Sequence, residues 1–143
     1  MDYLYDFMTK ASCQFLRGNR EEYMLTQRDV IANNREKERW LWNSASGNLL
    51  FAYEQLNEKD FKFFESLPIT FQYKKANYPA ITCCHGSPEN TRELLLVNKD
   101  NTKTWLDNID TEYLISAHTH FPCEMRYQGK HYRWKKPEEE SEK

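Results

Sequence analysis

The pattern of apolar and polar positions predicts helices that alternate with short strands. Helical spacing of apolar residues marks four segments, at 2–11, 20–32, 57–68 and 101–110. Alternating or continuous β-branched and aromatic residues mark strands at 69–75, 78–84 and 112–117, and a hairpin at 123–134. A further strand-like run covers 13–19, and residues 49–56 fit either a helix or a strand. This alternation predicts an α/β or α+β layered fold, and the hairpins predict a mixed sheet.

Capping signals set the ends of several predicted elements. Asn19 is expected to cap the helix at 20–32, with Glu22 at its third position. Asn57 is expected to cap the helix at 57–68. Ser87-Pro88, directly after the strand at 78–84, has the form of a helix start.

Composition indicates a folded chain with a thin core. The 143 residues suit one domain, which we place at 1–134, and the charged tail at 135–143 is expected to be disordered. Hydrophobic residues make up only 39% and mean hydropathy is -0.93, but the 15% of aromatic residues supply large surfaces for burial. The net charge of -2 predicts no nucleic-acid footprint, and no apolar run is long enough to cross a membrane.

The cysteines and the first residues bear on the compartment. The opening MDYLYDFMTK lacks the basic and apolar regions of a secretory signal. Cys13, Cys83, Cys84 and Cys123 match no zinc-ribbon spacing. We therefore expect reduced thiols and a cytoplasmic location, with Cys83 and Cys84 in a buried strand.

Polar residues follow three strand-like runs, FLRGN, TCCHG and ISAHTH. Ligands bind beyond the carboxyl ends of strands in open α/β sheets, which predicts that Asn19, His85, His118 and His120 meet at one edge. Neutral imidazole is a common ligand of transition metals. Each signal also has a simpler interpretation, because Asn19 suits a helix cap, HGSP a strand–turn–helix joint, and a histidine pair a solvated loop.

Three motifs in order resemble the calcineurin-like metallophosphoesterase family. They are GNRE at 18–21, CHGSP at 84–88 and AHTH at 117–120, and the resemblance covers about residues 12–134. It implies a truncated two-sheet sandwich flanked by helices. It also implies a metal-dependent hydrolase, a phosphatase or phosphodiesterase in which two metal ions activate water against a phosphate ester.

The resemblance assigns roles to individual residues. Asn19, His85 and His118 would bind one ion, His120 would bind the other, and Arg20 would contact phosphate. The family's Asp-x-His and Gly-Asp motifs are absent, so the predicted ligands are all neutral and do not offset the charge of two ions. We therefore expect one divalent ion, Mn, Fe or Zn, to bind weakly, and the chain alone to have little or no activity.

Two alternatives stay open at this stage. In the first, the chain is a non-catalytic binding subunit, a split half whose exposed sheet edge docks a polypeptide that supplies the missing N-terminal half. In the second, it is a small globular protein without metal chemistry. The sequence identifies neither a specific phosphate-ester substrate nor an oligomeric state.

Overall fold

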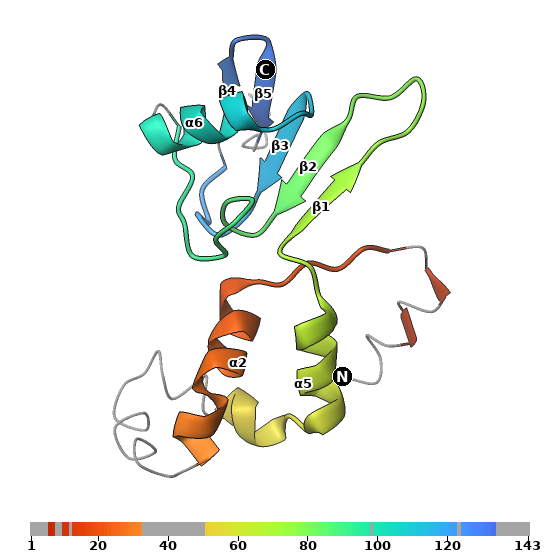
Figure 1. The fold of residues 1–143 in the computed structure, drawn as a ribbon, viewed down its shortest axis with the longest axis vertical. Helices are drawn as coiled ribbons and strands as arrows, with labels where there is room; N and C mark the ends of the chain where they lie inside the picture. The colour runs from red at the N-terminus through yellow and green to blue at the C-terminus, as the bar shows by residue number, and fades with distance from the viewer. Residues whose placement is uncertain are drawn as a thin grey trace, which may run out of the picture. The chain divides into compact units, whose positions relative to one another are not determined.

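The computed structural model describes residues 6–7, 10–11, 13–32, 51–97, 99–122 and 124–133. The chain divides into two compact units, residues 1–68 and 69–143 (Figure 1). The described strands all belong to the second unit, and helices occur in both. The mixed α+β class is thus confirmed, whereas the two-sheet sandwich and the domain boundary at 134 stay predictions. The expected disordered tail at 135–143 lies outside the described residues.

The first unit is built on α2 (Asn19–Ala32) and α5 (Glu58–Ser66), and residues 51–55 are also helical. Its buried side chains include Met24 of α2 and Phe61 and Phe64 of α5. The strand predicted at 13–19 is wrong, because residues 13–18 form no strand. The Arg17 guanidinium instead donates to two carbonyl groups at the end of α5, those of residues 64 and 65.

Asn57 caps α5 as the sequence predicts, and the cap has the form of a capping box. The Asn57 side chain accepts a hydrogen bond from the Asp60 amide at 3.3 Å, and the Asn57 amide donates to the Asp60 carboxylate at 2.9 Å. These bonds satisfy amide groups that have no partner within the helix.

The start of α2 lies one residue earlier than predicted. The Gly18 amide donates to the Glu21 carboxylate at 2.9 Å, and the Gly18 carbonyl accepts from the Glu22 amide at 3.1 Å. Gly18 therefore takes the cap position expected of Asn19, and Glu21 takes the third position expected of Glu22. Glycine adopts a cap conformation at little cost, which explains the shift.

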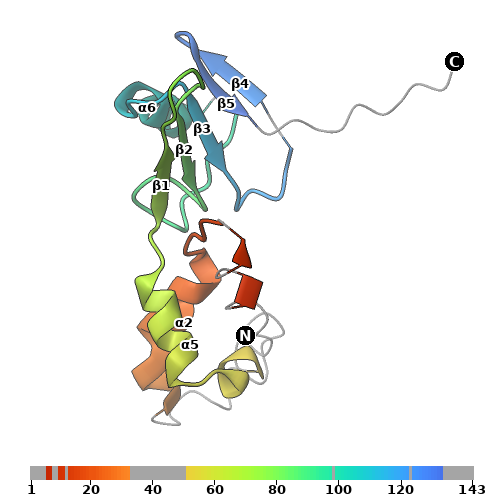
Figure 2. The same ribbon diagram turned by 90° about the vertical axis from the view of Figure 1, so that its right-hand side faces the viewer.

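The second unit contains a five-stranded mixed sheet in the order β1-β2-β3-β5-β4. Its strands are β1 (Thr70–Tyr73), β2 (Ile81–Cys84), β3 (Tyr113–Ser116), β4 (Glu124–Tyr127) and β5 (Lys130–Arg133). The two predicted hairpins, β1–β2 and β4–β5, are antiparallel, whereas β2, β3 and β5 run parallel. Helix α6 (Asp100–Asn108) lies between β2 and β3 in the chain and covers one face of the sheet (Figure 2).

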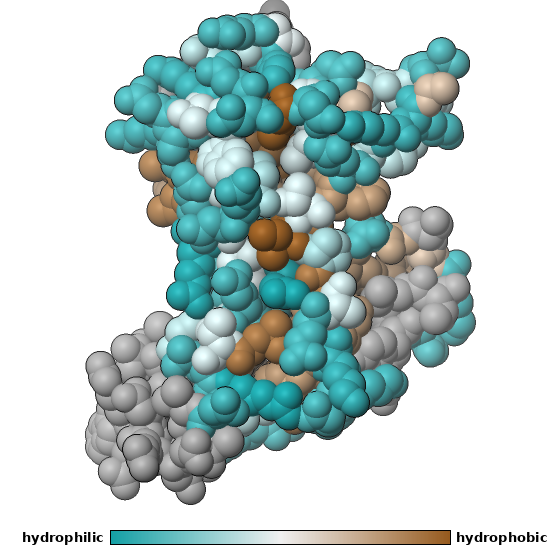
Figure 3. Space-filling model, viewed as in Figure 1, coloured by the Kyte–Doolittle hydropathy of each residue, from teal (hydrophilic) through white to brown (hydrophobic). Residues whose placement is uncertain are grey.

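The core of this unit lies between α6 and that face. Leu95, Leu106 and Leu114 have no exposed surface, and Cys84, Ile109 and Met125 pack around them. Hydroxyl side chains are buried to the same extent, namely those of Thr82, Thr91, Thr102, Thr111, Ser87 and Ser116. The visible surface in Figure 3 is mainly hydrophilic, with apolar residues in small separate areas.

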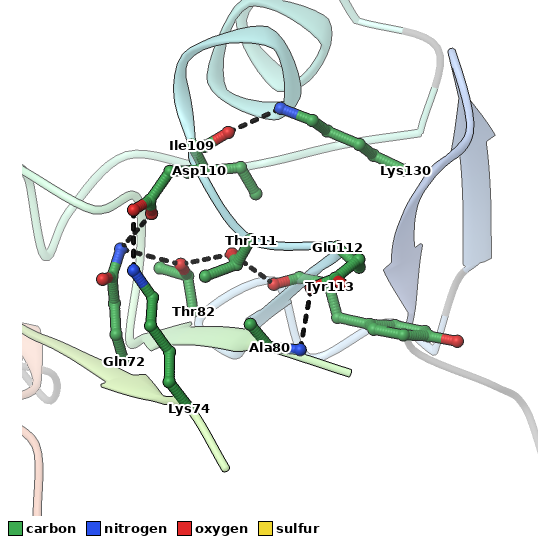
Figure 4. Close-up of polar contacts among 10 residues, drawn as sticks. All are labelled: Gln72, Lys74, Ala80, Thr82, Ile109, Asp110, Thr111, Glu112, Tyr113 and Lys130. Carbon is green, nitrogen blue, oxygen red and sulfur yellow. Dashed lines mark hydrogen bonds and ion pairs between the residues drawn. The ribbon is translucent and has the colours of Figure 1, made fainter. Parts of the chain in front are cut away.

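A polar network fixes the amino ends of β2 and β3 (Figure 4). The buried hydroxyl groups of Thr82 and Thr111 lie 2.6 Å apart. Asp110 accepts hydrogen bonds from Lys74 at 2.7 Å and from Gln72 at 2.8 Å. These contacts, with Lys74 first and Gln72 second, hold the pKa of the Asp110 carboxyl below its ordinary value. The network joins β1, β2 and the turn before β3, and so helps to fix the register of β3 against β2.

Candidate functional site

Two histidines meet where the parallel strands β2 and β3 end. His85 directly follows β2, and His118 lies two residues beyond β3. Cys84 pairs with Ser116 in the register of the two strands, so both loops begin at the same level of the sheet. The His85 and His118 ring centres lie 5.1 Å apart, with the ring planes at 56°. The predicted convergence of these two imidazoles is therefore present.

Hydrogen bonds tie the His85 loop to the end of β3. The Ser116 hydroxyl lies 2.6 Å from the Gly86 carbonyl oxygen and 3.2 Å from that of His85, so its single proton serves both. The Ala117 amide donates to the His85 carbonyl at 2.9 Å. The backbone beneath His85 is thereby held against the strand that leads to His118.

The loop after β3 has an unusual backbone. His118 and His120 both have a left-handed conformation, with φ of 57° and 56°. Between them, the Thr119 amide donates to the Ala117 carbonyl at 2.5 Å in a tight turn. A left-handed residue other than glycine costs about 1–2 kcal/mol, and such strain often occurs at functional sites. The His118 side chain is half-buried, and that of His120 is exposed.

The loop after β2 is a tight turn and not the helix start that Ser87-Pro88 predicts. The Ser87 amide donates to the Asn90 carbonyl at 2.9 Å, and the Ser87 hydroxyl accepts from the Asn90 amide at 3.1 Å. A Cβ on Gly86 would lie 2.4 Å from that same Asn90 carbonyl oxygen. Ser87 therefore forms a tight turn with Asn90, and only glycine fits at the preceding position, 86.

The cysteines beside the site are poor candidates for metal ligands. Burial raises the pKa of Cys84 to about 12, and burial also raises the pKa of Cys83. Metal ligation requires the thiolate, so a raised pKa opposes it. Cys84 is buried and Cys83 half-buried, which agrees with their predicted place in a strand.

Asn19 and Arg20 belong to the other compact unit, where they begin α2. Asn19 is half-buried and Arg20 is exposed. Their predicted roles, as metal ligand and phosphate contact, stay predictions. The same holds for the assignment of His120 to a second ion.

The spacing of the two imidazole rings is that expected of two ligands on one divalent ion. Metal–nitrogen bonds of about 2.0–2.1 Å place a ligating ring centre about 3.2 Å from the ion, so two such rings at angles of about 90–110° lie about 4.5–5.2 Å apart. The observed separation of 5.1 Å agrees with this range. Within the described ranges, no group of three or more His, Cys, Asp or Glu side chains is arranged to hold a metal. The donor set is thus two neutral nitrogens, which suits weak binding.

Sequence reasoning missed two residues that shape the site, Ser116 and Glu93. Ser116 is a buried hydroxyl at the end of an apolar strand, and a polar residue just before HTH was an available signal. Glu93 directly precedes the apolar run LLLV, and its carboxylate accepts hydrogen bonds from Trp105 and Asn101. A single acidic residue next to an apolar run often marks a paired carboxylate.

Comparisons with known proteins identify a fold and not a family. No family model matches the sequence, and no curated protein matches it. In the part of the chain that the structure describes, no helix has the length and apolar character needed to cross a membrane. A similar solved structure is that of a hypothetical protein, PH1004, from Pyrococcus horikoshii OT3, with a TM-score of 0.68 and 14% sequence identity. The match covers 92% of this chain but only 54% of the other, so this chain has the fold of about half of that protein.

Proposed function

We propose that this protein has a metal site of the metallophosphoesterase type, in which His85 and His118 bind one divalent cation. The observation that carries the proposal is the pair of rings, 5.1 Å apart, at the ends of adjacent parallel strands. The order of the GNRE, CHGSP and AHTH motifs supports it from the sequence.

Each residue has a limited part in this chemistry. A divalent ion bound at the site would act as a Lewis acid toward a phosphate ester oxygen. His85 and His118 would hold that ion, and the Ser116 hydroxyl keeps the His85 loop in place.

The donor set also implies that the chain alone binds metal weakly. Imidazole ligands bring no negative charge to offset a divalent ion, and a second ion would add further repulsion. We therefore expect one ion per chain and little turnover by the isolated protein.

The test is calorimetric titration of the purified chain with Mn²⁺ and Zn²⁺. His85→Ala and His118→Gly are expected to lower the affinity about tenfold, because each removes one of two donors. Glycine is chosen at position 118 because it tolerates the left-handed backbone. His131→Ala in β5 is the matched control and keeps the affinity of the parent chain. Equal affinity in all four proteins would refute the proposal.

Activity is measured separately, with an aryl phosphate ester and added Mn²⁺. We expect a low rate that His85→Ala abolishes. A high rate in the parent chain that survives both site substitutions would show that other residues carry the reaction.

A second candidate function is the binding half that docks a partner. One observation favours it, because the sheet face opposite α6 is apolar and open. Phe71, Cys83 and Ile115 share that face through their pairing, and Ile115 is 41% exposed although it lies in the central strand. A sheet with two apolar faces is stable when both are covered.

This candidate predicts a specific complex. Co-expression with a neighbouring-frame polypeptide that carries an Asp-x-His motif is expected to give a stable heterodimer with restored phosphoesterase activity. Ile115→Asp should weaken the association, and Tyr78→Ser, at an exposed position outside the three-residue set, should not. Two polypeptides that stay separate and inert would exclude it.

A further inference from the structure

The carboxylate of Glu93 joins helix α6 to the loop that carries His85. One oxygen accepts a hydrogen bond from the Trp105 indole at 2.9 Å, and the other accepts from the Asn101 amide group at 3.0 Å. The Glu93 amide donates to the Asn90 carbonyl at 3.2 Å, and the same carbonyl accepts from the Ser87 amide at 2.9 Å. Trp105 and Asn101 both belong to α6, whereas Ser87 lies two residues after His85.

Ser87 transmits this contact to the backbone of the loop. Its side chain has no exposed surface, and the residue closes a turn with Asn90 through bonds of 2.9 Å and 3.1 Å. Gly86, between His85 and Ser87, packs so closely on Asn90 and Thr91 that a Cβ does not fit. A displacement of Ser87 is therefore passed along a tightly packed backbone to His85.

The His85 loop is held from two sides. On one side, Ser116 and Ala117 bond to its carbonyl groups from the end of β3. On the other side, Glu93 connects α6 to the turn that Ser87 forms with Asn90. The first attachment fixes the height of the loop above the sheet, and the second fixes its position beside the helix.

We propose that Glu93 is a positioning residue, which holds His85 at the metal-binding distance from His118 through Ser87 and α6. This inference rests on the function proposed above. Hydrogen bonds to a charged acceptor are about twice as strong as neutral ones, so the two from α6 make a firm anchor. The bond from Ser87, followed by those from Asn101 and Trp105, holds the pKa of Glu93 below its ordinary value, as expected for a carboxylate stabilised in its charged form.

A double-mutant cycle on Mn²⁺ affinity tests this role in the full chain. The proteins are the parent, Glu93→Ala, His85→Ala and the double variant. We expect Glu93→Ala to weaken Mn²⁺ binding about tenfold, as supporting residues around metal ligands commonly do. In the His85→Ala background the same change should have no further effect, because Glu93 acts through His85.

Two further variants separate positioning from charge and from folding. Glu93→Gln keeps an acceptor for the indole and should recover part of the affinity. Glu89→Gln removes a carboxylate of the same loop that is exposed, and it should leave the affinity unchanged. The ring resonances of His85 and His118, observed by NMR without metal, should shift in Glu93→Ala and stay near the parent values in Glu89→Gln.

Each outcome decides between the two proposals. If His85→Ala does not alter Mn²⁺ affinity, the proposed metal site is refuted. If His85→Ala weakens binding and Glu93→Ala does not, the metal site stands and the positioning role is refuted. An equal loss in both backgrounds, an equal effect of Glu89→Gln, or a failure of Glu93→Gln to fold would also overturn the positioning role.

Discussion

Replacement of Gly86 by alanine tests the link between loop packing and the histidine site. The new Cβ would lie 2.4 Å from the Asn90 carbonyl oxygen and 2.7 Å from the carbonyl group of Thr91. Cβ atoms essentially never approach other atoms closer than 3.0 Å, so the two backbone segments must separate by about 0.6 Å. The neighbours are main-chain atoms, which have no rotamer with which to move away.

The expected loss of stability follows from three contributions. Forcing an extra carbon into a packed site costs about 1–3 kcal/mol. Loss of the bond from the Ser87 amide to the Asn90 carbonyl adds about 1 kcal/mol. The lower entropy of the unfolded chain offsets about 0.4–1 kcal/mol. The net destabilisation is about 1–3.6 kcal/mol. The shifted loop should also lower Mn²⁺ affinity.

Hydrogen exchange measured by mass spectrometry is the suitable assay, because two compact units can open separately. Peptides from β2, β3 and the His85 loop should exchange about tenfold faster for every 1.4 kcal/mol lost. Gly129→Ala is the matched control, because Gly129 has a φ of 78° and no atom near its missing Cβ. Its cost is backbone strain at the β4–β5 turn. Unchanged exchange and Mn²⁺ binding in Gly86→Ala would refute the reasoning.

Three other predictions follow from capping, titration and thiol burial. Asn57→Ala should lower the stability of the helical unit by about 1 kcal/mol in urea unfolding, since it removes the acceptor for amides of the first turn, and an unchanged midpoint would contradict this. The pKa of Glu93 is lowered in the folded state, so the stability that its carboxylate contributes is fully present above the ordinary pKa of 4.5 and is lost as the pH falls through the lower folded-state pKa. Glu93→Gln should flatten this part of the curve of stability against pH in acid titrations. At pH 8, iodoacetamide should label the exposed Cys13 rapidly and Cys84, whose pKa is about 12, only on unfolding. Peptide mapping measures the labelling of each cysteine, and equal labelling of the two would contradict this prediction.

Much of the fold could be predicted because its signals are local. The α5 helix has its cap and apolar spacing within a dozen residues, and the turn between β4 and β5 contains Gln128-Gly129 with both residues at positive φ. The β2 and β3 strands were also predictable from their apolar, β-branched content. In each case the residues that determine the element lie next to one another in the sequence.

Predictions failed where a tertiary contact replaced a local preference. The Ser87 hydroxyl does accept from the Asn90 amide as a helix cap would, but the Asn90 carbonyl accepts from the Ser87 amide and closes the chain into a turn. The run at 13–19 has strand composition, but Arg17 instead bonds to the end of α5. No pattern within either segment reports these partners.

The histidine pair lies between these cases. Placing His85 and His118 together needed only the rule that parallel strands end at the same edge, and the register of Cys84 with Ser116 satisfies it. The left-handed backbone of His118 and His120 was not predictable, because only a few per cent of residues other than glycine adopt it, even though histidine is enriched among them.

The hydroxyl-rich core of the second unit has a thermodynamic consequence. Four threonines and two serines are buried there beside only a few leucines. Exposure of apolar surface raises the heat capacity on unfolding, whereas exposure of polar surface lowers it. This unit should therefore unfold with a heat-capacity increment per residue below the usual range of about 12–15 cal/mol/K. Its free energy of unfolding would then vary little between refrigeration and body temperature, with cold denaturation displaced far below freezing.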